Sequence, residues 1–153
     1  MTAAHCFNMY LNGNYSNLYA LVGDHNISGS DDTPYPALYK IQSVIKHNLY
    51  VPTSENQAND IALVKTTEIR YKRSVGPACL PYVFMNYNSY FDDKYLTVPG
   101  WGALEFSGPS SDVLRKVSLK VMSTCASDKQ ICTFSSGMDS CQVIENKLNL
   151  KNV

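Results

Sequence analysis

Alternating hydrophobic and polar positions along the chain predict short β-strands. From residue 39 to residue 47 the side chains alternate, and one face is predicted to hold Tyr39, Ile41, Ser43 and Ile45. Further along, Val117, Leu119 and Val121 alternate with Ser118 and Lys120. Residues 61–64 form a short apolar run that follows a polar loop. A two-residue period is typical of a half-buried strand, and a short apolar run after a loop is consistent with a buried one, so these three segments are predicted as strands.

Polar, turn-rich segments separate the predicted strands, at residues 28–36, 52–59 and 107–112. Short strands between long polar loops favour an all-β barrel or sandwich. Residues 69–88 contain two prolines and a glycine close together. Such residues interrupt regular structure, and this segment is either a crossing between subdomains or a surface loop.

Composition narrows the classes of protein that remain. The chain has 153 residues, a length that suits one domain, and 44% of them are hydrophobic, which excludes intrinsic disorder. It carries 13 basic and 13 acidic residues, so its formal net charge is zero. We therefore expect neither nucleic acid nor an anionic membrane as the main partner, because both require a basic surface. No apolar run approaches the ~18–20 residues of a membrane span, and the first residues do not resemble a secretory signal.

The chain has an odd number of cysteines, so they cannot all pair with one another. The five are Cys6, Cys79, Cys125, Cys132 and Cys141. Either the thiols are free in a reducing compartment, or some partners lie elsewhere. A zinc site is disfavoured because no two cysteines have the C-x₂-C spacing, and we expect no metal and no cofactor.

Two residues stand out as candidates for chemistry. His5 follows small residues and precedes a cysteine, and Asp60 stands at the start of an apolar run. A histidine that works as a base needs a carboxylate on its second ring nitrogen to hold one tautomer. A histidine and an aspartate alone are weak evidence, since a lone histidine in a β protein is more often structural.

Five sequence strings together resemble the trypsin-like, chymotrypsin-fold serine endopeptidases of peptidase family S1. In chain order they are Thr-Ala-Ala-His-Cys at 2–6, Asp-Ile-Ala-Leu-Val-Lys at 60–65, Val-Gly-Pro-Ala-Cys-Leu-Pro at 75–81, Pro-Gly-Trp-Gly at 99–102 and Met-Asp-Ser-Cys-Gln at 138–142. The tyrosine-rich loops and the Gln-Ile-Cys-Thr segment resemble arthropod secreted or venom-type members.

The resemblance implies an incomplete double antiparallel β-barrel. Residues 1–142 would form a partial domain, with 1–70 as the remainder of the N-terminal barrel and 71–142 as the first part of the C-terminal barrel. Residues 143–153 would be an unrelated tail. We expect further family sequence to be missing from both ends of the domain.

The resemblance also assigns roles to individual residues. His5 looks like the general base and Asp60 like the carboxylate that orients it. Asp139 stands where the family keeps the acid that pairs with an Arg or Lys side chain. The complete relative would be a secreted enzyme that cleaves polypeptides after Arg or Lys.

The resemblance stops after Gln142. Where the family continues with Gly-Asp-Ser-Gly-Gly-Pro, this chain reads Val-Ile-Glu from residue 143, so Glu145 occupies the position of the nucleophilic serine. A carboxylate offers no hydroxyl to activate, and the glycine-dependent oxyanion loop is also replaced. We therefore expect an inactive chain. The alternatives are a non-catalytic homologue that acts by binding proteins, and a chain that does not accumulate in a folded state.

The resemblance also implies how the cysteines would pair, and a separate motif marks two asparagines. Cys125 and Cys132 would form a disulfide, Cys6 and Cys141 would pair with cysteines outside this chain, and Cys79 would join a propeptide or upstream domain. Asn14 and Asn26 begin the two Asn-x-Ser triplets of N-glycosylation, which matter only in the secretory pathway.

Overall fold

The computed structural model describes residues 1–10, 13–29, 36–52, 58–82, 90–104, 107–124, 131–136 and 150–152. The chain divides into two compact units, Met1–Gly76 with Asn146–Val153, and Pro77–Glu145. Across the described ranges the regular structure consists of seven strands and one 3₁₀ turn, η1 (His5–Phe7). The predicted all-β fold is therefore confirmed. No helix among these residues has the length and hydropathy needed to cross a bilayer.

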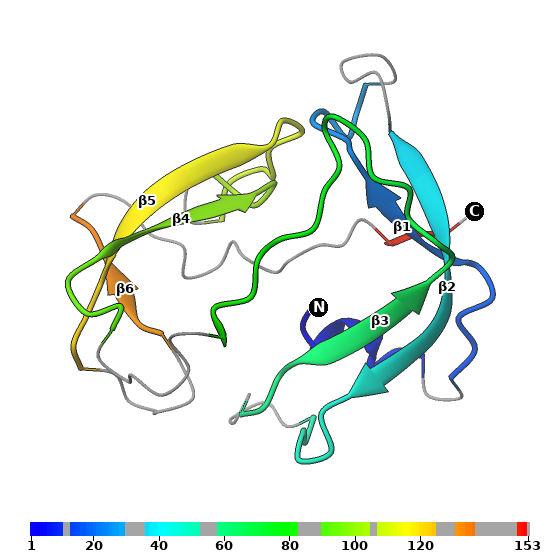
Figure 1. The fold of residues 1–153 in the computed structure, drawn as a ribbon, viewed down its shortest axis with the longest axis horizontal. Helices are drawn as coiled ribbons and strands as arrows, with labels where there is room; N and C mark the ends of the chain where they lie inside the picture. The colour runs from blue at the N-terminus through cyan, green and yellow to red at the C-terminus, as the bar shows by residue number, and fades with distance from the viewer. Residues whose placement is uncertain are drawn as a thin grey trace. The chain divides into compact units, whose positions relative to one another are not determined.

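The first unit is built on an antiparallel sheet in the order β3-β2-β1-β7 (Figure 1). Its strands are β1 (Leu18–Val22), β2 (Ala37–Lys46), β3 (Ala62–Thr66) and β7 (Leu150–Asn152). The central strand β2 pairs with β1 from Tyr19↔Lys40 to Val22↔Ala37, and with β3 from Ile41↔Thr66 to Lys46↔Ala62. The backbone of β7 pairs with β1 on its other side.

A β-bulge in β2 overturns one prediction from the sequence. The register against β3 shifts between Ile41 and Ser43. Before the shift Ile41 is 2% exposed, whereas after it Val44 packs against the core and Ile45 is 62% exposed. The prediction that Ile45 shares a face with Ile41 is therefore wrong, because one inserted residue exchanges the two faces of a strand.

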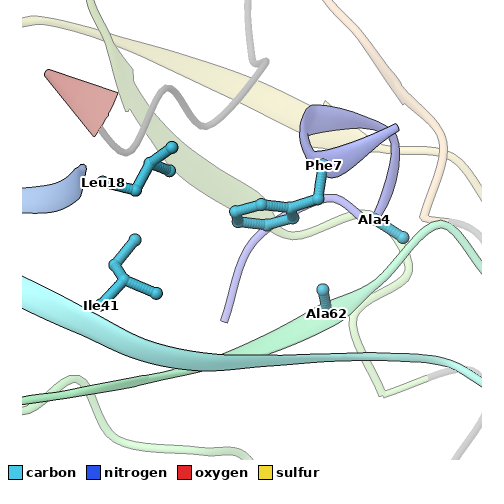
Figure 2. Close-up of a cluster of buried hydrophobic side chains, with 5 residues drawn as sticks. All are labelled: Ala4, Phe7, Leu18, Ile41 and Ala62. Carbon is cyan, nitrogen blue, oxygen red and sulfur yellow. The ribbon is translucent and has the colours of Figure 1, made fainter. Parts of the chain in front are cut away.

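The core of the first unit joins η1 to the sheet. Its fully buried members are Ala4, Phe7, Leu18, Ile41 and Ala62. Figure 2 shows the Phe7 ring pointing from the η1 turn toward Leu18 and Ile41. Tyr15 meets this ring edge-on, with centroids 5.9 Å apart. Burial of the Phe7 ring is worth about 1.5–3 kcal/mol, and it anchors the turn that carries His5.

The second unit contains the antiparallel sheet β4-β5-β6. Its strands are β4 (Tyr95–Gly100), β5 (Arg115–Val121) and β6 (Thr133–Phe134). Leu119 and Val121 are 1% and 4% exposed, so the alternating pattern predicted this buried face correctly. At the surface, Lys120 Nζ lies 2.7 Å from Asp93 Oδ1. This hydrogen bond and the charge of Asp93 raise the pKa of Lys120.

Neither sheet closes on itself among the described residues. Two open antiparallel sheets in separate units agree with the incomplete double barrel that the sequence predicted.

Candidate catalytic site

Backbone pairing brings the His5 turn to the start of β3. The amide of Thr2 donates to the carbonyl of Ala62 at 3.0 Å, and the amide of Ala62 donates back at 2.7 Å. Thr2 is 5% exposed and Ala4 is fully buried. The chain then turns through η1, and the amide of Asn8 closes the turn on the carbonyl of His5 at 3.0 Å. His5 is thus held close to the residues that precede β3.

The residue before Asp60 has a left-handed backbone conformation. Asn59 has a φ of +58°, a backbone conformation that asparagine tolerates better than most residues. Its carbonyl accepts from the amide of Ile61 at 2.8 Å, and its side-chain amide donates to the carbonyl of Leu49 at 3.2 Å. These contacts fix the turn immediately before β3 and therefore the direction of the Asp60 side chain.

His5 and Asp60 contact one another through both carboxylate oxygens. The backbone amide of His5 donates to Oδ1 at 2.8 Å, and Nδ1 lies 2.6 Å from Oδ2. The Asp60 side chain is 13% exposed and the His5 side chain 32%. Because an ionised carboxylate only accepts, Nδ1 of His5 carries the proton of this bond. In the neutral imidazole the lone pair is then on Nε2, which can accept a proton from a substrate or a nucleophile.

One sulfur lies close to this second ring nitrogen. Cys6 Sγ is 3.8 Å from Nε2 of His5, and the Cys6 side chain is half-buried.

A second group of polar side chains connects the His5 turn to β2. Lys46 Nζ donates to Oδ1 of Asn8 at 3.0 Å, and Nδ2 of Asn8 donates to the Tyr50 hydroxyl at 2.8 Å. The Lys46 ammonium also lies 5.8 Å from the centre of the Tyr50 ring. Asn8 follows the η1 turn directly, so this group supports the turn that carries His5. Sequence reasoning missed it, since its members are distant in the chain and match no motif.

The structure describes only some of the other residues that the sequence singled out. Asp139, Glu145, Cys125 and Cys141 lie outside the described residues. Cys132 is disulfide-bonded, and Cys79 is an exposed free thiol. Among the described side chains, no group of three or more His, Cys, Asp and Glu residues is placed to hold a metal ion.

The two glycosylation triplets adopt similar local turns. Asn14 is exposed, and its Oδ1 accepts from the amide of Ser16 at 3.1 Å. Asn26 is half-buried, and its Oδ1 accepts from both the amide and the hydroxyl of Ser28, at 3.1 and 2.8 Å.

Comparison with known proteins identifies the family to which the chain belongs. The family model for trypsin matches residues 1–142. The chain is therefore a member of the trypsin family of serine proteases.

Curated relatives place it near insect venom proteases. It is 37% identical to a venom serine protease of Polistes dominula, an alignment that covers 93% of this chain and 53% of that protein. It is 34% identical to venom serine protease 34 of Apis mellifera, over 94% of this chain and 37% of that protein. The arthropod resemblance inferred from the sequence is confirmed. The chain spans only about half, or less, of the length of these two relatives.

Proposed function

We propose that His5 and Asp60 are the general base and the orienting carboxylate of a trypsin-like serine endopeptidase, and that this chain carries them without a nucleophile. The observation that supports the first part is the pair of hydrogen bonds from His5 to Asp60, at 2.8 and 2.6 Å. They hold Nδ1 against the carboxylate, so that Nε2 is the ring nitrogen that would take the proton of a serine hydroxyl.

The second part of the proposal rests on the sequence. Glu145 occupies the position of the family's serine, and the string Gly-Asp-Ser-Gly-Gly-Pro is absent from the chain. A glutamate has no hydroxyl for His5 to deprotonate, and the chain does not encode the glycine loop whose backbone amides would stabilise an oxyanion. Peptide hydrolysis by acyl transfer would therefore not proceed on this chain.

The substrate class follows from Asp139 and is also a proposal. An acid at the base of the specificity pocket selects an Arg or Lys side chain by charge pairing. In a complete relative, the substrate would be a polypeptide cleaved after a basic residue. An extracellular location is proposed for that relative. The Cys125–Cys132 disulfide and a link from Cys79 to a propeptide or upstream domain belong to the same proposal.

Hydrolysis of a chromogenic peptide that ends in Arg tests the proposal. The purified chain should release no more product than its His5→Ala variant, while a complete trypsin-like protease in the same buffer shows that the assay works. Turnover by the chain that His5→Ala abolishes would overturn the assignment of an inactive chain.

The second candidate is a non-catalytic homologue that acts by binding proteins. The ordered core around Phe7 and the paired strands of both units support it, because a binding role requires only a stable surface. A cooperative urea transition together with the absence of turnover would favour this role. A non-cooperative transition would instead favour a chain that does not accumulate in a folded state.

Of the two glycosylation triplets, Asn14 is the better acceptor. Its side chain is exposed, whereas Asn26 is half-buried and its amide nitrogen lies against Gly29. Expression through a secretory host followed by glycosidase digestion should show a glycan that Asn14→Gln removes. A glycan that persists in Asn14→Gln and disappears in Asn26→Gln would reverse this assignment.

A further inference from the structure

A polar hollow lies on the first unit at the bulge of β2, and neither His5 nor Asp60 lines it. Its volume is about 640 Å³, within the range of small-molecule sites. The lining side chains that can hydrogen-bond include Ser16, Lys40, Gln42, Ser43, Lys65 and Thr67. They come from the segment before β1, from β2 and from β3 with the residue that follows it. We call this feature the Lys40–Lys65 hollow.

The bulge accounts for the position of the hollow. Ile41 is paired with Thr66 and Ser43 with Lys65, so Gln42 is the additional residue on β2. A bulge bends and twists its strand and redirects the side chains around it. The lining residues 40–43 span this irregularity, with Lys65 opposite it.

The charged side chains that line the hollow are two lysines. No carboxylate is among the lining residues, and in the described part of the chain neither Lys40 nor Lys65 has an ion-pair partner. Both are exposed. The hollow therefore offers two positive charges together with neutral hydrogen-bonding groups.

The hydroxyl groups that line the hollow are the next feature of the site. Among the described residues, the hydroxyls of Ser16, Ser43 and Thr67 donate and accept no side-chain hydrogen bond. Hydroxyl and amide groups of this kind match the hydroxyls of a sugar ring, which both donate and accept. The ammonium groups add a preference for an anionic substituent on that ring.

We propose that the Lys40–Lys65 hollow binds a sugar unit that carries a sulfate or phosphate ester. The ester would lie between the two ammonium groups, and the sugar hydroxyls would bond to the neutral side chains. A hollow of this volume exceeds what a single inorganic oxyanion fills, which favours the esterified sugar over the free ion. This proposal does not depend on the one made for His5 and Asp60.

Calorimetric titration of the full chain, produced without N-glycans, tests the assignment. The probes are a sulfated heparin-type disaccharide, the same disaccharide without sulfate, glucose 6-phosphate, and inorganic sulfate. Comparing the sulfated disaccharide with the sugar phosphate shows whether the hollow prefers a sulfate ester or a phosphate ester. We expect at least one of them to bind at concentrations below about 10 mM, more tightly than the neutral disaccharide and than inorganic sulfate.

Charge-removing variants identify the site. Lys40→Gln and Lys65→Gln should each weaken binding roughly fivefold, a typical size for one exposed charge contact. Lys116→Gln is the matched control, because Lys116 is an exposed lysine on β5 of the other unit and the net charge changes equally. Unchanged unfolding midpoints would show that all three variants fold.

Four results would overturn the proposal. The first is no binding of either anionic sugar. The second is equal binding of the neutral disaccharide. The third is equal binding of inorganic sulfate, which would contradict the sugar part. The fourth is an effect of Lys40→Gln and Lys65→Gln no larger than that of Lys116→Gln.

Discussion

Asp60 accepts two hydrogen bonds from His5, one from the backbone amide at 2.8 Å and one from Nδ1 at 2.6 Å. One carboxylate thus fixes both the main chain and the ring of the same residue. The two residues are 55 positions apart, and the contact joins the η1 turn to the residues that begin β3.

Asp60→Asn should change the tautomer of His5. The side-chain amide of asparagine can keep the bond from the backbone N–H through its oxygen, but it then presents N–H to Nδ1. Nδ1 must accept, so the ring proton moves to Nε2. Long-range ¹H–¹⁵N correlation spectra report which nitrogen is protonated. An unchanged tautomer would show that the Nδ1–Asp60 bond does not control the ring.

Asp60→Ala should lower the free energy of unfolding by about 1–3 kcal/mol, because two donors of His5 lose a charged acceptor. Urea denaturation measures the change. Asp93→Ala is the control, since Asp93 makes a surface ion pair with Lys120 and its side chain is 77% exposed. A loss no greater for Asp60→Ala than for Asp93→Ala would contradict a structural contribution from the His5 contact.

Phe7→Ala should destabilise the first unit strongly. Phe7 is fully buried in the core beneath His5, and its truncation leaves a cavity. The expected loss is about 3–5 kcal/mol in urea denaturation. Met9→Ala is the matched control two residues on, because Met9 is 79% exposed and should change stability by less than about 0.5 kcal/mol. Similar losses for the two variants would argue against the core described here.

Asn59→Ala and Asn59→Gly should differ, although both remove the side-chain bond to Leu49. At a φ of +58° alanine is strained and glycine is not. We expect Asn59→Ala to be less stable than Asn59→Gly by about 1 kcal/mol in thermal or urea unfolding. Equal stability, or a more stable alanine variant, would contradict a left-handed residue before Asp60.

Asn8 and Tyr50 should be energetically coupled. Asn8→Ala removes the hydrogen bonds to both Tyr50 and Lys46, whereas Tyr50→Phe removes only the hydroxyl. A double-mutant cycle should therefore give a coupling energy of about 0.5 kcal/mol or more. Strictly additive losses would show that the contact contributes nothing to the stability of the His5 turn.

The sequence predicted two strands from local patterns that the fold leaves intact. Residues 117–121 follow a two-residue period inside β5, and the continuous apolar run at 61–64 lies in and beside β3. In β2 the prediction failed beyond Ile41, because nothing in the local pattern indicates the bulge that turns Ile45 outward.

Four strands, β1, β4, β6 and β7, were not predicted, and β1 and β4 illustrate two different reasons. The short apolar run of β1 (Leu18–Val22) lacks the polar alternation that predicts a strand, and its backbone pairs with β2 on one side and with β7 on the other. β4 ends in Pro99 and Gly100, which carry little strand signal. Pro99 is tolerated there because β4 is an edge of its sheet.

The candidate site was only partly accessible from the sequence. His5 and Asp60 were found because each lies in a family string. The support from Lys46 and Tyr50 depends on side chains about 40 residues away from Asn8, and no local pattern encodes that proximity.

Labelling with a fluorophosphonate probe tests the central claim most directly, because the probe reacts covalently with an activated serine such as the nucleophile of this family. The folded chain should not be labelled, while a complete trypsin-like protease in the same tube is. Labelling of the chain that is lost in the His5→Ala variant would contradict the account, since it would reveal a nucleophilic serine served by the His5–Asp60 pair.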